Sequence, residues 1–557
     1  MTAAIPAQRQ LWLMLFIALI IWCGNLEYRK LALSDEGRYS EIPRYMVVSG
    51  DWLTPRLNGI KYFEKPPLQY WATAAAYETF GIHQWTARLW PALTGMLGVL
   101  TMFCAGRCLF GAECGLYAAL VLGSSVMYAL IAHVNTLDMG LTFFLGFGLV
   151  AMLIAFDERT AARASRWWVH IAWVAFACAV LSKGLIGIVL PAAVVVLYML
   201  FKRNFTLWHK LHLVTGGLLC LLICAPWFIA VSIVNPEFPW FFFVHEHFQR
   251  YTTTIHNRYQ SWYYFVPVLL VGILPWTFTL LDALFNARKH ISGNSGFDHT
   301  LFLLLWSGFI FFFFSLSDSK LVSYILPIFP ALALLIGIRL TMLSSRTFAW
   351  QIVPLAVLAL AALLAAPQVV KLANTSTLAA LYQAQVPWLI AAAVLLLAGC
   401  IVAIIYSWRG KLRPAIIAIA FASLLASQVA LTGYDKLAPV HSAYYIAQNI
   451  KPYLKPGVPF YSVATYDQTL PFYIGRTVTL VLFWDEMRYG LQQEPGLEIP
   501  DIATFETKWR ADPYALAIME PGMFEQLQRD GLPMREIARD TEHVVVTTVV
   551  PIQGGSL

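Results

Sequence analysis

The chain has 557 residues, of which 59% are hydrophobic and only 12% are charged. A soluble globular protein carries about 25% charged residues, so this chain has too few polar side chains to cover its apolar interior in water. The mean hydropathy of +0.64 therefore indicates a polytopic membrane protein. The same composition excludes a disordered chain, a collagen-like repeat and a small disulfide scaffold.

Apolar stretches long enough to cross a membrane recur along most of the sequence. A transmembrane helix needs about 20 mostly apolar residues, and about thirteen stretches meet this requirement. They lie near residues 11–26, 87–107, 115–133, 138–156, 167–182, 184–201, 212–234, 262–285, 301–316, 324–343, 348–366, 387–408 and 414–433. No small-residue cleavage site follows the first stretch, so we interpret it as an uncleaved anchor.

Lys and Arg are distributed unevenly between the two sides of this predicted bundle. The short loops on the side of the N terminus all carry cations, namely Arg107, Arg159, Arg163, Arg166, Lys202, Arg203, Lys210, Arg288, Lys289, Arg339, Arg346, Arg409, Lys411 and Arg413. The opposite short loops carry far fewer, chiefly Lys183, Lys320 and Lys371. The positive-inside rule then predicts a cytoplasmic N terminus and a C terminus on the outer side.

The long polar segments fall on the predicted outer side. Two are loops, residues 27–86 and 235–261, within a membrane domain of residues 1–433. The third is the tail, residues 434–557, which we expect to form a small α/β domain. Its short β-rich runs are residues 458–463, 477–481, 514–519 and 544–549, with helical stretches near residues 505–510 and 523–529.

The first outer loop holds the densest group of candidate functional residues. Asp35 and Glu36 are adjacent carboxylates, and the helical spacing of Tyr39, Ile42 and Met46 predicts a short interfacial helix after them. A carboxylate can orient or deprotonate an acceptor. The alternative is a solvated loop in which these two carboxylates only form salt bridges.

Cations near this pair fit a charged sugar phosphate, because they stabilise a phosphate leaving group. They are Arg38 and Lys65, and Lys65 follows Glu64 directly. Pro66 and Pro67 restrict the backbone there, so Glu64 and Lys65 should be presented rigidly.

Further ionisable residues stand beside the apolar stretches on the same side. Asp138 begins one predicted span and Lys183 follows another, and ionisable groups at membrane depth are functional candidates. Their alternative role is snorkelling at the interface. Lys320 and Tyr324 are four residues apart, so they could share a face and hold one phosphate, although a plain re-entrant turn also fits.

The second outer loop carries the sequence His245-Glu246-His247. Two histidines two residues apart do not share one helix face, so a metal site there needs another carboxylate. We keep His245 and Glu64 as a weak divalent-cation hypothesis, with polar packing against lipid headgroups as the alternative. The sequence requires no other cofactor.

These pieces together resemble the polyprenyl-phosphate-dependent membrane glycosyltransferases of the GT-C fold, which are related to the protein O-mannosyltransferases. Within them, the chain is most similar to the lipid A aminoarabinose transferases, and the resemblance covers its whole length. The matching segments are Asp35-Glu36, Gly50-Asp51-Trp52, Glu64-Lys65-Pro66-Pro67-Leu68-Gln69-Tyr70-Trp71 and Lys320-x-x-x-Tyr324-x-Leu326-Pro327-x-x-Pro330.

The resemblance implies an all-α membrane bundle with a periplasmic C-terminal α/β domain, in the inner membrane of a Gram-negative bacterium. It implies a pentosyltransferase that moves 4-amino-4-deoxy-L-arabinose from undecaprenyl phosphate to a phosphate of lipid A. That transfer lowers the negative charge of the outer membrane and weakens the binding of polymyxin and other cationic antimicrobial peptides. No Rossmann fingerprint for a nucleotide sugar occurs in the sequence, and no nucleic acid partner is expected.

The resemblance assigns the catalytic role of the family's Asp-Glu pair to Asp35 and Glu36. We expect phosphate binding by Arg38, Lys65, Lys320 and Tyr324, with Tyr39, Glu64, Asp138 and Lys183 as further cavity residues.

Two alternatives stay open at this point. The first keeps a polyprenyl-phosphate sugar donor but transfers the sugar to a protein or to another glycan. The second is a transporter or flippase. It is disfavoured because the charged residues cluster in the outer loops and because no inverted repeat is visible.

Overall fold

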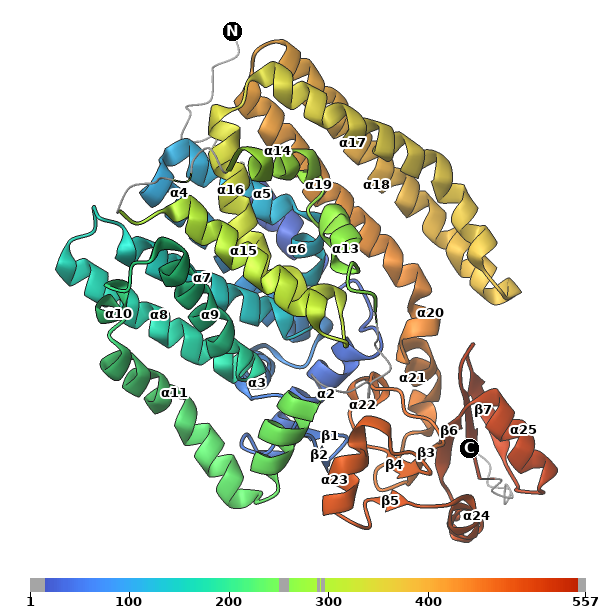
Figure 1. Cartoon of the computed structure of the whole chain (residues 1–557). Helices are drawn as coiled ribbons and strands as arrows, with labels where there is room; N and C mark the ends of the chain where they lie inside the picture. The colour runs from blue at the N-terminus through green and yellow to red at the C-terminus, as the bar shows by residue number, and fades with distance from the viewer. Residues whose placement is uncertain (1–15, 250–259, 288–290, 292–295, 549–557) are drawn as a thin grey trace.

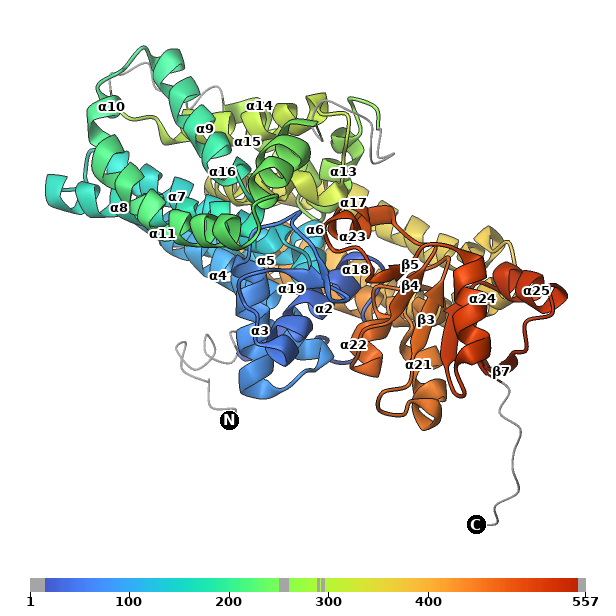
Figure 2. The ribbon, with the colours of Figure 1, turned by 90° about the horizontal axis from the view of Figure 1, so that it is seen from below.

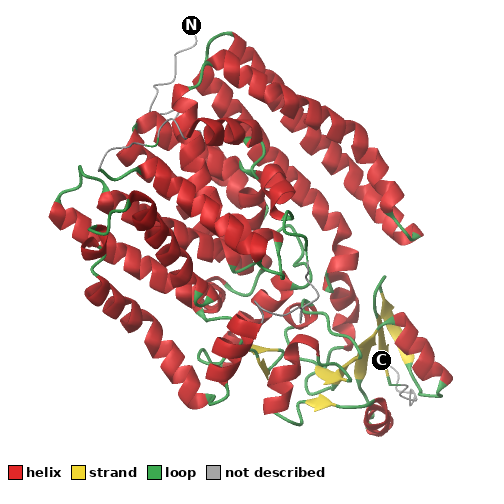
Figure 3. Cartoon of the chain, viewed as in Figure 1, coloured by secondary structure: helices red, strands yellow, loops and turns green. Residues whose placement is uncertain are grey.

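The computed structural model describes residues 16–249, 260–287, 291 and 296–548 of the chain. Figures 1 and 3 show a body of helices with one small sheet-containing region at the end opposite the N terminus. The helices long and apolar enough to cross a membrane are α4 (Gln84–Phe110), α7 (Asp138–Phe156), α8 (Ala162–Lys183), α11 (Leu213–Val234), α15 (His299–Leu316), α16 (Phe329–Met342) with the preceding η3 (Val322–Ile328), α17 (Ser345–Ala365) with the following η4 (Ala366–Leu372), α18 (Ser376–Trp408) and α19 (Leu412–Tyr434). The protein is therefore a multi-pass membrane protein.

The predicted count of about thirteen spans is not confirmed, because the described residues contain nine such helices, or ten with one bent pair. The stretch 115–133 breaks at Ser125 into α5 (Ala112–Ser124) and α6 (Val126–Ile131). The stretch 262–285 bends by 112° between α13 (Phe265–Gly272) and α14 (Thr277–Ala287). Pro275 lies in that break, where a proline ends a helix because it lacks an N–H donor.

Two further predicted stretches are not among these long helices. The stretch 184–201 forms α9 (Ile186–Lys202), which is one of the shorter apolar helices and precedes the single turn α10 (Leu207–Lys210). The stretch 11–26 lies partly outside the described residues.

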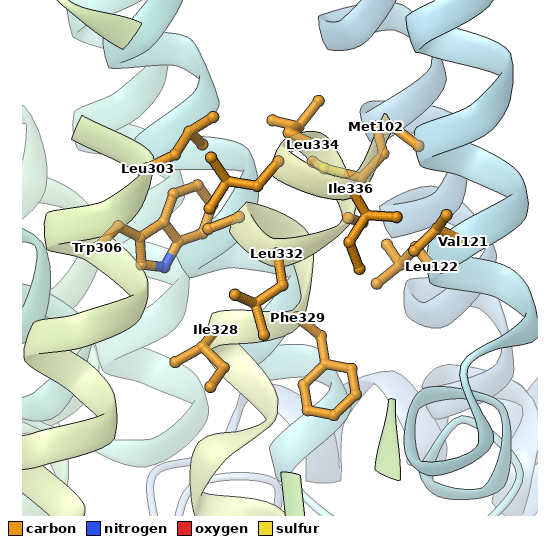
Figure 4. Close-up of a cluster of buried hydrophobic side chains, with 14 of the residues drawn as sticks. Met102, Val121, Leu122, Leu303, Trp306, Ile328, Phe329, Leu332, Leu334 and Ile336 are labelled. Carbon is orange, nitrogen blue, oxygen red and sulfur yellow. The ribbon is translucent and has the colours of Figure 1, made fainter. Parts of the chain in front are cut away.

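The core of the bundle lies around α7 and the combined segment of η3 and α16. The most apolar parts of these two segments are 83% and 78% buried. Figure 4 shows how α16 fills the space between its neighbours, with Leu332 and Ile336 near residues of α15 and α5. The Trp306 indole in α15 donates a hydrogen bond to the Pro327 carbonyl at 3.0 Å, so even this large side chain has no unpaired polar group. The α11 helix is only 17% buried, as expected for a helix that faces lipid.

The first outer loop folds into α2 (Asp35–Ser49), a hairpin of β1 (Arg56–Leu57) and β2 (Ile60–Lys61), and α3 (Leu68–Phe80). The predicted helix after the Asp-Glu pair is confirmed, and Tyr39, Ile42 and Met46 are all buried. Gly50 ends α2 with φ of 73°, a left-handed conformation that favours glycine.

The C-terminal region contains a six-stranded sheet in the order β5-β4-β3-β6-β8-β7. Its strands are β3 (Phe460–Val463), β4 (Thr479–Val481), β5 (Glu498–Ile499), β6 (Leu516–Met519), β7 (Arg535–Arg539) and β8 (Val544–Thr547). The strands β5, β4, β3 and β6 run parallel, whereas β8 and β7 pair antiparallel. All four β-rich runs predicted from the sequence contain a strand, and β5 and β7 were not predicted.

Helices cover the two faces of this sheet differently. One hydrophobic core lies under α24 (Ile502–Ala511) and α25 (Pro521–Arg529), and it includes Phe505 and Trp509. The other core joins the sheet to α2, α21 (Tyr444–Ile450) and α22 (Leu470–Ile474), as Figure 2 illustrates from below. The sheet therefore packs directly on the first outer loop, and the expected division at residues 433 and 434 stays a proposal about folding units.

Candidate active site

A cavity of about 810 Å³ lies where the helical body meets the C-terminal region. Its wall combines the start of α2, the Glu64-Lys65 segment, the ends of α7 and α8, the π-helix η1 (Trp240–Gln249), η3, and the turn η7 (Asp485–Met487) with α23 (Arg488–Gln493). Most of the residues predicted for the site line this cavity, namely Asp35, Arg38, Tyr39, Glu64, Lys65, Asp138, Lys183, His245 and Tyr324.

Asp35 is the accessible carboxylate of the α2 start, with 41% of its side chain exposed. It accepts a hydrogen bond from Arg38 Nη1 at 2.7 Å, one turn further along the same helix. The other guanidinium nitrogen of Arg38 forms an ion pair with Glu486 of the C-terminal region. Arg38 is therefore held from both sides, and Asp35 presents its remaining surface to the cavity.

Glu36 turns away from the cavity and is 2% exposed. Both of its carboxylate oxygens accept hydrogen bonds from Arg88 of α4, at 2.7 and 2.8 Å. Burial alone would raise the pKa of Glu36, but Arg88 outweighs it and lowers the pKa to about 2. Glu36 also accepts hydrogen bonds from the backbone N–H groups of Ala32 and Asn135. These bonds fix the start of α2 to the segment before α7.

Lys65 lines the same cavity as Asp35 and belongs to the proline-restricted segment before α3. Its ammonium lies 3.3 Å from Glu246 Oε2 of η1 and donates to the Glu64 carbonyl at 2.9 Å. Lys65 therefore links the first and second outer loops through a carboxylate.

Asp138 and Lys183 form an ion pair between α7 and α8. The other Asp138 oxygen accepts a hydrogen bond from Ser323 Oγ at 2.9 Å, and the Lys183 ammonium lies 4.8 Å from the ring centroid of Tyr324. The structure thus brings together α7, α8 and η3, whose contacting residues lie up to 186 positions apart in the sequence. Local sequence spacing cannot predict such contacts.

Lys320 does not lie with the cavity residues in the described part of the chain. Its ammonium donates to the backbone carbonyls of Ser317 and Gln260, the latter at 2.8 Å. Desolvation lowers the pKa of Lys320 below its ordinary value. These bonds tie Lys320 to the loop before η3, and its binding of a phosphate together with Tyr324 stays a prediction.

His245 and Glu64 both line the cavity, as the metal hypothesis requires. Within the described ranges, however, no three His, Cys, Asp or Glu side chains gather closely enough to hold a metal ion. His245 stacks on Phe241 with ring centroids 4.9 Å apart, and its Nδ1 lies 3.6 Å from Glu246 Oε1. The divalent-cation site stays a hypothesis without a third ligand.

Three buried tyrosines surround the Arg38 guanidinium region. Burial raises the pKa of Tyr39, Tyr62 and Tyr70 well above that of a free phenol. Each phenol therefore stays neutral, and the hydroxyls of Tyr62 and Tyr70 are buried without a hydrogen-bond partner among the described atoms. Neutral hydroxyls beside fixed charges can donate to an anionic ligand.

Sequence reasoning missed the contribution of the C-terminal region to this cavity. Asp485, Glu486, Arg488 and Tyr489 line it from η7 and α23. Burial raises the pKa of Glu486, with Arg38 acting in the opposite direction. The charged residues that begin at Asp485, four positions after the strand that ends at Val481, were the available signal, because loops at the carboxyl ends of parallel strands commonly form sites.

Two family models match the sequence. Residues 9–245 match the dolichyl-phosphate-mannose-protein mannosyltransferase family, and residues 446–548 match the aminoarabinose transferase C-terminal domain. Relatives named undecaprenyl phosphate-α-4-amino-4-deoxy-L-arabinose arabinosyl transferase include one from Pseudomonas aeruginosa, 32% identical over 59% of this chain and 60% of its own length. Another, from Pseudomonas fluorescens, is 36% identical over 55% of each chain. The alignments with these curated relatives thus span about three fifths of their length.

Solved structures match over the whole chain. The structure of ArnT from Cupriavidus metallidurans bound to undecaprenyl phosphate is 39% identical, with a TM-score of 0.93, and the match covers 99% of this chain and 100% of that one. Its apo form gives a TM-score of 0.92 at the same identity and coverage. These matches confirm the resemblance and the GT-C fold with its C-terminal α/β region. The chain belongs to the family of aminoarabinose transferases that these relatives represent.

Proposed function

We propose that this protein transfers 4-amino-4-deoxy-L-arabinose from undecaprenyl phosphate to a phosphate group of lipid A. Its membership of the aminoarabinose transferase family supports this assignment. The observation that carries it is the placement of one accessible carboxylate, Asp35, in the same cavity as the cations Arg38, Lys65 and Lys183. A transfer between two lipid phosphates needs such a combination of groups.

The chemistry explains why the cavity contains cations beside its carboxylates. An oxygen of the acceptor phosphate attacks the anomeric carbon of the sugar, and the bond from that carbon to the undecaprenyl phosphate oxygen breaks. The leaving phosphate keeps the electron pair. Because the acceptor phosphate is already anionic, the main requirement is to hold two phosphates together against their repulsion.

Arg38, Lys65 and Tyr324 are proposed to bind the donor phosphate. Arg38 and Lys65 are each paired with a carboxylate. A phosphate can replace a carboxylate as the partner of an Arg or Lys with little change in geometry. Glu246 and Asp35 therefore hold the positions that phosphate oxygens would take, and they keep the cations desolvated and oriented.

Asp35 is proposed as the catalytic carboxylate. With a phosphate acceptor, it would orient the acceptor or pair with the ammonium of the sugar. Glu36 shares the family's motif, but its contacts with Arg88 support a positioning role, in which it fixes the start of α2 and so the direction of Asp35. Asp138 and Lys183 complete the far wall.

A second candidate is transfer of a polyprenyl-linked sugar to a protein. The match of residues 9–245 to the protein mannosyltransferase family favours it. In that reaction the acceptor is a neutral hydroxyl, and Asp35 would be the general base.

The proposed location is the inner membrane of a Gram-negative bacterium, with the N terminus in the cytoplasm and the C-terminal region in the periplasm. The distribution of Lys and Arg among the short loops supports this orientation. Alkaline phosphatase fused after the last residue should be active, since that enzyme works only in the periplasm. An inactive fusion of normal abundance would indicate the opposite orientation.

A divalent ion bound by Glu64 and His245 is kept as a weaker proposal. It predicts that prolonged treatment of the purified enzyme with a chelator lowers activity and that added metal restores it. If metal analysis shows that the ion has been removed and the activity is unchanged, this role is ruled out.

Mass spectrometry of lipid A tests the proposed function directly. The host would be a Gram-negative strain that makes the donor but lacks its own transferase. A lipid A species heavier by one aminoarabinose, present only with the intact protein, is the expected result. Unmodified lipid A, with the protein confirmed in the membrane, would favour the protein-acceptor alternative.

A further inference from the structure

A second hollow adjoins the active-site cavity on the surface of the C-terminal region. It has a volume of about 650 Å³ and lies between α23 and the edge strand β5, which are neighbours in Figures 1 and 2. Arg488 and Gln492 line both this groove and the cavity that contains Asp35. The two spaces therefore adjoin at α23, so a side chain such as Arg488 can serve a ligand in either of them.

The groove has the side chains that bind phosphorylated sugars. Trp484 is 39% exposed and offers an aromatic face, on which a sugar ring can stack. Glu498 also lines the groove and offers a carboxylate to a ligand hydroxyl or amino group, and its buried Oε2 accepts no hydrogen bond from any described residue. Gln492 adds an amide that can both donate and accept.

Arg488 differs from the other cations of the site. Arg38, Lys65 and Lys183 each have a carboxylate partner. For the exposed Arg488, the described part of the protein supplies no carboxylate within 4 Å. An anion can therefore reach it without displacing an acidic side chain.

The surroundings of the groove keep its shape without a ligand. Pro495 and Pro500 restrict the backbone at its rim. The adjacent turn η7 connects the two spaces rigidly, because Trp484 faces the groove whereas Glu486, two residues later, holds Arg38 in the cavity.

We propose that this groove is the acceptor subsite, in which Trp484 and Glu498 bind an amino-sugar ring of the acceptor and Arg488 binds its phosphate. This inference rests on the proposed function, because it takes the acceptor to be a phosphorylated glycolipid. The donor phosphate lies with Arg38 and Lys65, so the two phosphates are bound by different cations. The C-terminal region thereby selects the acceptor.

Binding of a soluble acceptor headgroup tests the subsite without requiring transfer. The probe is the deacylated, bisphosphorylated glucosamine disaccharide of lipid A, titrated against the full-length protein in detergent by calorimetry. The dephosphorylated disaccharide and inorganic phosphate serve as separate ligands, which distinguish recognition of the sugar from recognition of the phosphate.

Three variants give the expected pattern. Arg488→Gln should weaken binding of the bisphosphorylated disaccharide at least tenfold, whereas Trp484→Ala should weaken binding of both disaccharides. Arg529→Gln, which removes an exposed cation of α25 in the same region, should change neither. The affinity for undecaprenyl phosphate should be the same in all three.

Equal binding of the bisphosphorylated disaccharide by the wild type and Arg488→Gln would overturn the subsite, and so would its failure to bind the wild type at all. Equal affinity of the wild type for both disaccharides would overturn the role of the phosphate. A failure of the proposed function itself would be seen separately, as unmodified lipid A in the presence of the wild-type protein.

Discussion

The adjacent carboxylates Asp35 and Glu36 each form an ion pair with an arginine, and the two pairs differ in burial and in the number of their partners. The pair of Glu36 and Arg88 is almost fully buried, and Arg88 also donates to the carbonyls of Leu26, Arg29 and Lys30. The pair of Asp35 and Arg38 opens to the cavity through a carboxylate that is 41% exposed.

The difference supports separate roles for the two carboxylates of the Asp35-Glu36 motif. A buried pair with every polar atom bonded cannot exchange partners without a large desolvation cost, so it holds the backbone in place. A pair at a cavity wall can exchange a carboxylate for a substrate phosphate at little cost. The fixed pair therefore positions the exchangeable one.

The largest expected effect is on activity and comes from the exposed carboxylate. Asp35→Asn should lower the rate of transfer by about a hundredfold or more, because it removes the charge that acts on the acceptor or the sugar. Its thermal unfolding in detergent should stay close to that of the wild type, since Asp35 is the exposed partner of the pair and the buried Arg38 keeps its ion pair with Glu486.

Asp530→Asn is the matched control, because Asp530 is an exposed carboxylate at the end of α25, remote from the residues of the cavity. Normal transfer by the Asp35→Asn protein would remove Asp35 from the catalytic machinery.

Breaking the buried pair should act on stability instead. Arg88→Met leaves Glu36 buried without its cation, which costs about 3–5 kcal/mol. The double variant Glu36→Gln with Arg88→Met should recover part of that loss, because no unpaired charge remains. The measurement is the midpoint of thermal unfolding of each purified variant. Equal midpoints for the single variant and the wild type would contradict the anchoring role.

The same pair predicts a dependence of stability on pH. The pKa of Glu36 falls from its ordinary 4.5 to about 2 in the folded protein. A depressed carboxyl pKa stabilises the fold above pH 4.5, and the stabilisation, about 3 kcal/mol, is lost as the pH falls from 4.5 to 2. The gap in unfolding midpoint between the wild type and the double variant should therefore narrow over that range. A constant gap would show that another group dominates.

Smaller effects are expected from substitutions of two lysines, Lys65 and Lys320. Lys65→Ala should raise the donor concentration needed for half-maximal rate by about tenfold, since it removes a charge-assisted bond to phosphate of about 1.5 kcal/mol or more. Lys320→Ala should leave the donor dependence nearly unchanged and lower the unfolding midpoint slightly, because Lys320 bonds to backbone carbonyls. The reverse pattern would return Lys320 to the phosphate site proposed from its spacing to Tyr324.

Local patterns were sufficient for much of the architecture. The predicted span 138–156 coincides with α7, and the spacing of Tyr39, Ile42 and Met46 predicted α2. These predictions worked because burial in lipid or in a core selects apolar residues at a fixed helical period. The span count is not confirmed in the described residues, because a run of apolar residues does not show where a chain bends, as it does near Pro275.

The site divides in the same way. The sequence by itself was enough to predict a site in the first outer loop, because charged residues next to long apolar stretches are few and costly. It could not separate Asp35 from Glu36, which are chemically alike and adjacent. Only the tertiary structure decided between them, since Arg88 reaches Glu36 from 52 positions away and Glu486 reaches Arg38 from the C-terminal region. Burial and charge partners, which depend on contacts distant in the chain, distinguish the two carboxylates and support the different roles proposed for them.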